Sequence, residues 1–209
     1  MRHWPLLDLR VTTPRLELRL PTLDDLDELA DRALEGVHDP EFMPFLSSWT
    51  DAPADELPRK LIRRQLTSLA DWSPEKWRCH FMVVHEGRIV GTQNLRATDF
   101  ATTLEVGSGS WLGRSHQGKG IGTEMRAAAL HLAFAGLGAR SAVSSALTGS
   151  EASQAVSRKL GYRPNGENVV AVRGRRVSEH HFRLLREDFV CPVPVEIHGL
   201  DACRADFGG

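Results

Sequence analysis

The chain has 209 residues and a formal net charge of −1, with 41% hydrophobic and 25% charged residues, a composition that predicts one globular domain with an adequate core. The balanced charge, without a long basic run, argues against a surface for nucleic acid, and no apolar stretch is long enough to span a membrane. Residues 1–9 are too polar for a secretory signal, and three cysteines without C-x-x-C spacing favour a reducing cytoplasm over a disulfide framework.

The first predicted elements are a strand and a helix. Residues 7–20 alternate apolar and polar side chains, the period of a half-buried strand. Residues 21–25 supply a proline, an N-cap threonine and two first-turn aspartates, which predict a helix through about Leu34. Prolines make residues 40–53 irregular, and the apolar side chains there line either a substrate cleft or a small core under the loop. These side chains are Phe42, Met43, Phe45, Leu46 and Trp49.

Residues 54–72 place apolar side chains at helical spacing and basic ones, including Arg63 and Arg64, on the opposite face. Such a basic face is either solvated or in contact with an acidic acceptor. Residues 77–95 then predict a β-hairpin, and residues 103–112 predict a third strand. An extra glycine in this third strand predicts a bulge or a splayed strand.

A second long helix is predicted from residue 121 to the glycines at 136 and 138, followed by a short buried strand over residues 141–147. Residues 149–160 predict another helix, which Ser150 can cap, and residues 162–186 predict a final hairpin. We therefore expect a single domain over residues 1–190. The tail, residues 191–209, is predicted to be an extended arm that lies across a partner subunit in a homodimer.

Three glycines at alternate positions, Gly118, Gly120 and Gly122, connect the third strand to the following helix. Glycine opens backbone angles that other residues avoid, so free N–H groups can converge on a ligand at the helix start, where the helix dipole favours negative charge. The loop therefore predicts a diphosphate site. Two other phosphate loops fit less well: a P-loop needs Ser or Thr where Gly120 stands, and the dinucleotide fingerprint needs G-x-G-x-x-G after a first strand.

The segment Gln117-Gly118-Lys119-Gly120-Ile121-Gly122 matches Q/R-x-x-G-x-G/A, and here the chain resembles the GNAT superfamily of N-acyltransferases, whose pyrophosphate-binding motif this is. Residues 13–19 resemble the first strand of the RimJ/RimL-like branch of that superfamily. Ser150 and Ser153, followed by Lys159-Leu160-Gly161-Tyr162, resemble the N-x-x-S and K-x-G-F segments of the same branch. Together these segments extend the resemblance over residues 8–190.

The resemblance implies an α/β fold with a central, mixed, mostly antiparallel and splayed sheet of about seven strands, flanked by helices. It also implies acetyl-CoA, or another acyl-CoA, as co-substrate, an amine that attacks the thioester directly, and no metal. The strand before the loop is expected to splay from its neighbour and to pair with the pantetheine arm. The residues implied in cofactor binding are Trp111, Leu112, Gln117, Gly118, Lys119, Gly120, Ile121, Gly122, Thr123 and Ser150.

For the general base the resemblance favours Glu105, although the stretch from Glu105 to Leu112 is two residues longer than the family's E-I-G-Y-W-L. Because one residue of register swaps sheet faces, the direction of Glu105 stays open. His116 is a second candidate, since an imidazole titrates near neutral pH, but its place beside the diphosphate loop favours a structural role. Ser157 replaces the tyrosine that protonates the thiolate in many members, and the branch assigns that role to Ser153.

The implied activity is transfer of an acyl group to a primary amine, on a protein N-terminus or a small molecule. An α-amine titrates near 8 and a lysine side chain near 10.4, so weak base candidates favour the α-amine. Two alternatives stay open: a non-catalytic acyl-CoA sensor, which would keep the glycine loop without groups that handle protons, and a purely structural interaction protein. The expected partners are acyl-CoA, the amine acceptor and a second copy of the chain.

Overall fold

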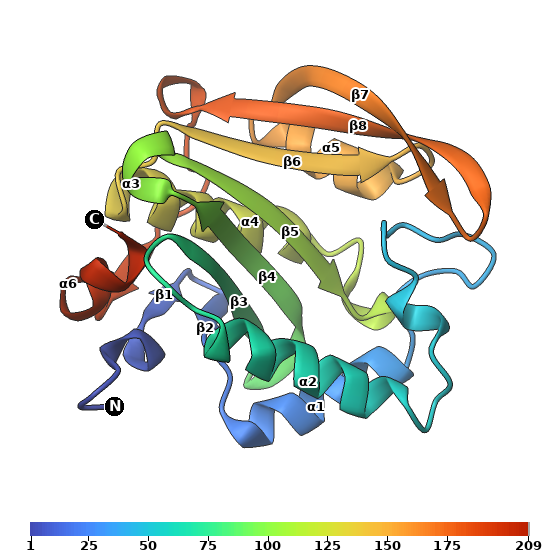
Figure 1. The fold of residues 1–209 in the computed structure, drawn as a ribbon, viewed down its shortest axis with the longest axis horizontal. Helices are drawn as coiled ribbons and strands as arrows, with labels where there is room; N and C mark the ends of the chain where they lie inside the picture. Colours follow the sequence, from blue (N-terminus) through green and yellow to red (C-terminus); the bar gives the residue numbers. More distant parts are fainter. Residues whose placement is uncertain (209) are drawn as a thin grey trace.

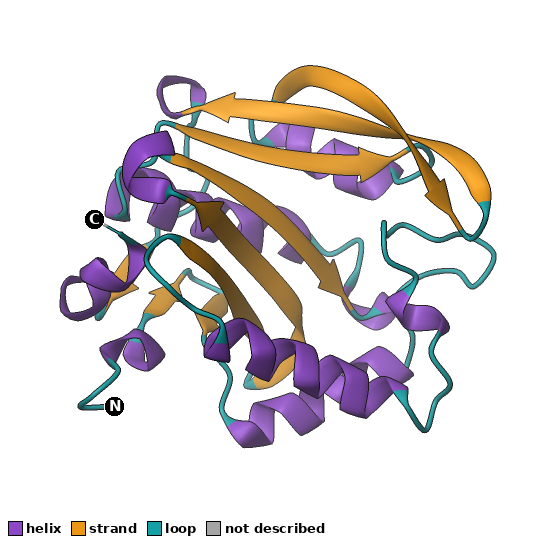
Figure 2. Cartoon of the chain, viewed as in Figure 1, coloured by secondary structure: helices purple, strands orange, loops and turns teal. Residues whose placement is uncertain are grey.

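The computed structural model describes residues 1–208, which form one nine-stranded sheet with helices on both faces (Figures 1 and 2). The strand order is β7-β8-β6-β5-β4-β3-β2-β1-β9, and within these residues only β5 and β6 pair in parallel. The strands are β1 (Arg10–Thr12), β2 (Leu16–Arg19), β3 (Lys76–His85), β4 (Arg88–Thr98), β5 (Glu105–Leu112), β6 (Ser141–Leu147), β7 (Arg163–Val172), β8 (Arg175–Leu185) and β9 (Glu196–His198).

Two pairs of longer helices cover the sheet. In Figure 1, α1 and α2 lie in front of β3 and β4, whereas α4 and α5 lie behind the sheet. The helices are α1 (Leu23–Leu34), α2 (Leu57–Ala70), α3 (Phe100–Thr103), α4 (Ile121–His131), α5 (Glu151–Lys159) and α6 (Leu200–Cys203), and α4 continues into a π turn over Leu132–Gly136. No helix of the described chain is long and apolar enough to cross a membrane.

The helices, the two hairpins and the strand over residues 141–147 are confirmed, and so is the mixed, mostly antiparallel, splayed sheet. The prediction of one strand over residues 7–20 is wrong. A 3-10 turn, Pro5–Asp8, precedes β1, and the turn at residues 13–15 folds the rest into the β1–β2 hairpin. This extra strand and β9 explain why the sheet has nine strands rather than about seven.

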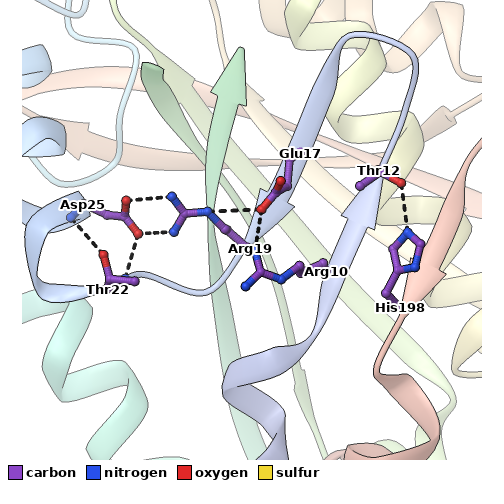
Figure 3. A network of polar contacts seen from close by, with 7 residues as sticks. All are labelled: Arg10, Thr12, Glu17, Arg19, Thr22, Asp25 and His198. Atoms are coloured by element: carbon purple, nitrogen blue, oxygen red, sulfur yellow. Dashed lines mark hydrogen bonds and ion pairs between the residues drawn. The ribbon is translucent and has the colours of Figure 1, made fainter. Parts of the chain in front are cut away.

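A polar network fixes the N-terminal hairpin to α1. Thr22 and Asp25 form a capping box at the start of α1, and Arg19 of β2 donates a 2.8 Å hydrogen bond to the Asp25 carboxylate (Figure 3). Capping satisfies N–H groups of the first turn that have no intrahelical acceptor. The predicted N-terminus of this helix is therefore confirmed, and the network fixes the start of α1 to β2.

The tail packs against its own subunit. β9 pairs antiparallel with β1, and Thr12 Oγ1 lies 3.1 Å from His198 Nε2 (Figure 3). Further along, Phe207 is 1% exposed, and its ring lies 5.0 Å from the ring of Trp77. Residues 191–208 thus add a strand and core side chains to the domain, whereas the sequence predicts an arm across a partner.

β5 and β6 diverge along their length. Their pairing runs from Glu105–Ser141 to Gly107–Val143 and then stops, while β5 continues against β4 as far as Leu112 (Figure 1). The β4–β5 register is uninterrupted, so the sequence alternative of a bulge in this strand is wrong and the alternative of a splayed strand is confirmed. The edge of β5 that faces β6 consequently has no strand partner over residues 108–112.

Candidate functional site

The glycine loop joins the splayed end of β5 to the start of α4. Gly118 and Gly120 have φ angles of 73° and 80°, a left-handed conformation that L side chains rarely adopt, and Gly120 is the N-cap of α4. Among the described residues, the N–H groups of residues 118–122 have no hydrogen-bond acceptor. Free amides that converge at a helix start form an anion site, so the geometry suits a diphosphate.

Side chains of neighbouring elements hold this loop in place. The Gln117 amide donates to the carbonyl oxygens of Val37 and Leu112, at 2.7 and 2.8 Å. Arg15 donates to the Lys119 carbonyl at 3.2 Å and to the buried Glu124 carboxylate of α4 at 2.7 Å. The side chain of Gln117 therefore holds the loop against residues 37 and 112.

His116, the second base candidate of the sequence, lies on the 3-10 turn that precedes this loop. Burial lowers the pKa of its imidazole, and so do the nearby charges of Arg32 and Lys119. Its backbone N–H donates to the carbonyl oxygen of Gly113 at 2.9 Å. The imidazole thus lies beside the anion site, on the turn that leads into it.

The splayed half of β5 presents different side chains to the two faces of the sheet. Trp111 points toward α1 and α2, where its ring lies 5.4 Å from that of Trp49, and Leu112 is buried on the α4 face. Across the gap, Ser150 follows the end of β6. It is the N-cap residue of α5, but its hydroxyl makes no capping bond and is buried without a partner. A buried hydroxyl at this position can bind a ligand between the strands.

On the α4 face, a buried guanidinium lies under the splayed strand. Arg126 of α4 is 4% exposed and donates to Ser157 Oγ at 2.9 Å and to Ser110 Oγ at 3.4 Å. Burial lowers its pKa. The Ser157 hydroxyl in turn donates to the Ser153 carbonyl at 3.2 Å, so Ser157 is fully engaged in structural hydrogen bonds.

Tyr162, which the sequence places only in a motif, lies buried where β5 and β6 separate. Its hydroxyl lies 3.4 Å from Ser108 Oγ, and Ser108 is the first β5 residue beyond the pairing with β6. Burial raises the pKa of Tyr162, while the nearby Arg126 charge opposes this effect. The family's K-x-G-F segment ends in phenylalanine, whereas this chain has Tyr162 at that place. The added hydroxyl was therefore the signal available in the sequence.

Glu105 lies at the paired end of β5. Its carboxylate accepts a 2.7 Å hydrogen bond from Ser141 and forms a 2.8 Å ion pair with Arg183 of β8. On the same face, across the gap, the buried Glu179 carboxylate lies 3.7 Å from the His181 ring. Glu179 and His181 were not predicted as site residues from the sequence. Alternation along a strand identifies side chains that share a face, but it does not reveal which strand borders the gap.

Residues 40–53 cross from α1 to the β7–β8 hairpin on the α2 side of the sheet. Asp51 pairs with Arg173 of the hairpin turn, with one contact at 2.8 Å, and Met43 is buried beside Leu147. A cavity of about 330 Å³ separates this segment from α2. Its lining is Ser48, Trp49, Asp51, Ala52, Pro53, Leu57, Lys60, Leu61 and Arg64. The apolar loop therefore contributes Met43, Phe45 and Trp49 to small core clusters, as one sequence alternative predicts, and Trp49 also lines the cavity.

A splayed sheet with a diphosphate loop at the end of one splayed strand defines a coenzyme A-dependent acyltransferase. Residues 15–163 match the family model of the acetyltransferase (GNAT) domain, and the chain belongs to the GNAT family of N-acetyltransferases. The assignment that the glycine motif suggested is thereby confirmed.

Solved structures share this fold at low sequence identity. RimL, a ribosomal L7/L12 α-N-protein acetyltransferase in complex with coenzyme A, aligns with a TM-score of 0.63 and 18% identity over 83% of this chain and 95% of its own. A structure assigned as a ribosomal-protein-serine acetyltransferase from Vibrio cholerae aligns with a TM-score of 0.65 and 20% identity, over 86% of this chain and 98% of its own. A chimera of the Vibrio cholerae spermidine N-acetyltransferase SpeG aligns with a TM-score of 0.64 and 16% identity, over 83% of this chain and 96% of its own. RimL among these structures is consistent with the RimJ/RimL-like resemblance.

Proposed function

We propose that this protein transfers an acyl group, most readily the acetyl group of acetyl-CoA, directly to a primary amine on a small molecule or a protein N-terminus. The observation that carries the proposal is the end of β5–β6 pairing at Gly107. From that residue, an unpaired strand edge leads to Leu112 and then to the free amides of residues 118–122. This continuous path suits a long ligand with a diphosphate at one end and a thioester at the other.

Each part of the path has a proposed role in cofactor binding. The amides of residues 118–122, with the Thr123 hydroxyl, bind the diphosphate, and the side chain of Lys119 adds a positive charge. Backbone groups of Trp111 and Leu112 pair with the pantetheine arm along the free edge. The buried Ser150 hydroxyl supplies a hydrogen-bonding partner from the β6 side, where the family's motif places an asparagine.

Orientation supplies the largest part of the rate in this proposal. Placing two reactants together contributes about 7–11 kcal/mol, whereas general base catalysis contributes about 10²- to 10⁴-fold. Glu105 remains the base proposed from the sequence, but its carboxylate is held by Ser141 and Arg183. Glu179 faces the same gap from β8 and is the competing candidate.

The departing thiolate needs a proton or a compensating charge. The sequence assigns this role to Ser153, and the structure adds the Tyr162 phenol and the Arg126 guanidinium, which both lie next to the splayed residues 108–110. We propose that the Tyr162 O–H donates to the sulfur and that the Arg126 charge stabilises the thiolate. A phenol close to a buried guanidinium can perform this step without a covalent intermediate.

The test is a turnover assay with acetyl-CoA and a panel of primary amines, in which free thiol is followed and the acylated product is identified by mass spectrometry. Turnover of any amine supports the transferase, whereas tight coenzyme A binding without turnover supports the acyl-CoA sensor. Glu105→Gln and Glu179→Gln are then compared by pH-rate profile. The variant that removes the acidic limb of the profile identifies the base, and an unchanged profile excludes that carboxylate.

Location and assembly belong to this proposal as well. We infer a cytoplasmic enzyme from the cysteine content, and fractionation of cells that express the full chain tests it. The homodimer was expected because the tail was predicted to be an arm across a partner subunit. In the single chain, β9 of that tail pairs with β1 instead. Sedimentation of the full chain measures the oligomeric state directly: a dimer would require another interface.

A further inference from the structure

Three arginines form a cluster on the α2 face of the sheet. Arg64 lies on α2, and Arg78 of β3 and Arg96 of β4 are cross-strand partners. Within residues 1–208, none of these guanidiniums has an ion-pair or hydrogen-bond partner. The arginine cluster, Arg64, Arg78 and Arg96, therefore places three positive charges together without a direct ion-pair partner, and the Glu179 carboxylate of β8 is close enough for its charge to act on Arg96.

Beneath this cluster, buried polar groups lack partners. His80 is 5% exposed and neither ring nitrogen has a hydrogen-bond partner, and the side-chain oxygens of Asn94 and Gln65 are equally unsatisfied. His80 and Asn94 are cross-strand partners, and Gln65, Arg78 and His80 lie together between α2 and the sheet. The unsatisfied Asn94 and Gln65 atoms are oxygens, so they could pair only with an N–H or O–H donor of a ligand, such as its amine end.

The arginine cluster lies where β5 and β6 separate. A side-chain carbon at Gly107 would approach the Arg96 guanidinium carbon to 2.9 Å, so this guanidinium covers the last β5 residue that pairs with β6. Arg64 also lines the cavity of about 330 Å³ beside Trp49, and Trp49 packs against Trp111 of the splayed strand. A molecule in that cavity would therefore meet Arg64 of the cluster, on the side of the sheet where Trp111 lies.

We propose that the amine acceptor carries a carboxylate, which the arginine cluster binds. This inference rests on the proposed function and names the class of its acceptor. Guanidinium groups bind carboxylates through paired N–H donors, and a bound carboxylate would neutralise part of the cluster. Polyamines such as spermidine would instead bring further positive charge next to three clustered guanidiniums, which opposes their binding.

The carboxylate can come from two sources, and matched acceptors distinguish them. Glutamate and glutamine test a free amino acid with or without a second carboxylate, and glycine against glycinamide tests the α-carboxylate itself. Ser-Glu-Gly-NH₂ and Ser-Gln-Gly-NH₂ test an acidic residue behind a peptide N-terminus. Spermidine is the cationic comparison. We expect the acidic member of at least one pair to have the higher kcat/KM, and spermidine to be the poorest acceptor.

Variants on the full chain connect this preference to the arginine cluster. Arg78→Gln and Arg64→Gln should each raise KM for the acidic acceptor by about 10-fold or more, because each removes a charge-assisted contact, while KM for acetyl-CoA stays unchanged. Arg63→Gln, the adjacent exposed arginine on α2, is the matched control and should change neither constant. A preference for amides or for spermidine, or equal KM values in all three variants, would overturn the proposal.

A binding experiment separates this inference from the proposed function. Calorimetry with N-acetylglutamate in the presence of coenzyme A needs no turnover. Binding that Arg78→Gln weakens supports the anion site even if no amine is acylated, in which case only the transferase proposal fails. Turnover of neutral amines together with no detectable N-acetylglutamate binding would leave the transferase intact and refute the carboxylate acceptor.

Discussion

Replacing Gly120 by aspartate should abolish tight coenzyme A binding. The φ angle of Gly120 is 80°, and a side-chain carbon there would lie 3.4 Å from Arg15 Nη2. Arg15 is already paired with Glu124, at 2.5 Å, so it is not free to neutralise a new carboxylate. The introduced charge would therefore stand at the N-terminus of α4, among the amides proposed to bind the diphosphate.

The size of the effect follows from two separate terms. A side chain in the left-handed region costs about 1–2 kcal/mol of folding free energy, and both Gly120→Ala and Gly120→Asp incur this cost. Only aspartate adds repulsion, which at ~5 Å and an effective dielectric constant of ~20 is about 3 kcal/mol for each phosphate charge. The dissociation constant of coenzyme A should consequently rise by ~10²-fold or more in Gly120→Asp.

Isothermal titration calorimetry with coenzyme A measures the affinity, and urea unfolding measures the stability of each variant. Gly166→Asp in β7 is the matched control, because Gly166 also has a left-handed φ angle, 103°, and no atom lies near its side-chain position. It should lose comparable stability but no affinity. If Gly120→Asp binds coenzyme A within threefold of the unaltered protein, the diphosphate does not lie on this loop and the site assignment fails.

Three further predictions test other parts of the structure. Tyr162→Phe should lower kcat by about 10²-fold without changing KM for acetyl-CoA, and Ser153→Ala should leave kcat near its original value; the reverse pattern would return the thiolate to the serine. Phe207→Ala should cost about 3–5 kcal/mol in urea unfolding, whereas Val190→Ala, at an 81% exposed side chain, should cost little; equal losses would mean that the tail does not contribute to the core. Burial and the arginine cluster lower the pKa of His80 to about 3. Between pH 6.5 and about 3 the unfolded chain therefore binds a proton that the folded chain does not bind, and the free energy of unfolding falls as the pH drops through this range. His80→Gln should reduce that fall, and an identical pH dependence of unfolding would show that His80 does not titrate in this way.

Local sequence signals predicted much of the fold. A short run of the buried type predicted the strand over residues 141–147, and the threonine and aspartates at residues 22–25 predicted the start of α1, because both signals depend only on neighbouring residues. The β1–β2 hairpin was missed since the alternation continues on both sides of the turn at Pro14. The tail was misread because its apolar residues are few, and their partners, Trp72 and Trp77, lie far away in the sequence.

The candidate site likewise has one part that the sequence predicts and one part that only the structure shows. The glycine loop is one contiguous segment, so its sequence predicted both its conformation and its place before α4. The arginine cluster instead joins α2, β3 and β4, and only the β3–β4 register brings Arg78 opposite Arg96. The basic face of α2 was visible in the sequence, together with the alternative that it contacts an acidic acceptor. Its meeting with two strand arginines required the structure.

The arginine cluster also affects how strong a base the reaction needs. His80 reports the local field: burial and the charges of Arg64, Arg78 and Arg96 together lower its pKa to about 3. An ammonium group near these arginines is repelled by the same positive charges, which Glu179 and a bound carboxylate offset only in part. The cluster that would bind an acidic acceptor would thereby favour its neutral, nucleophilic amine. An enzyme built in this way needs a site that accepts the proton after attack more than a strong base before it, which agrees with carboxylates at Glu105 and Glu179 on the same face.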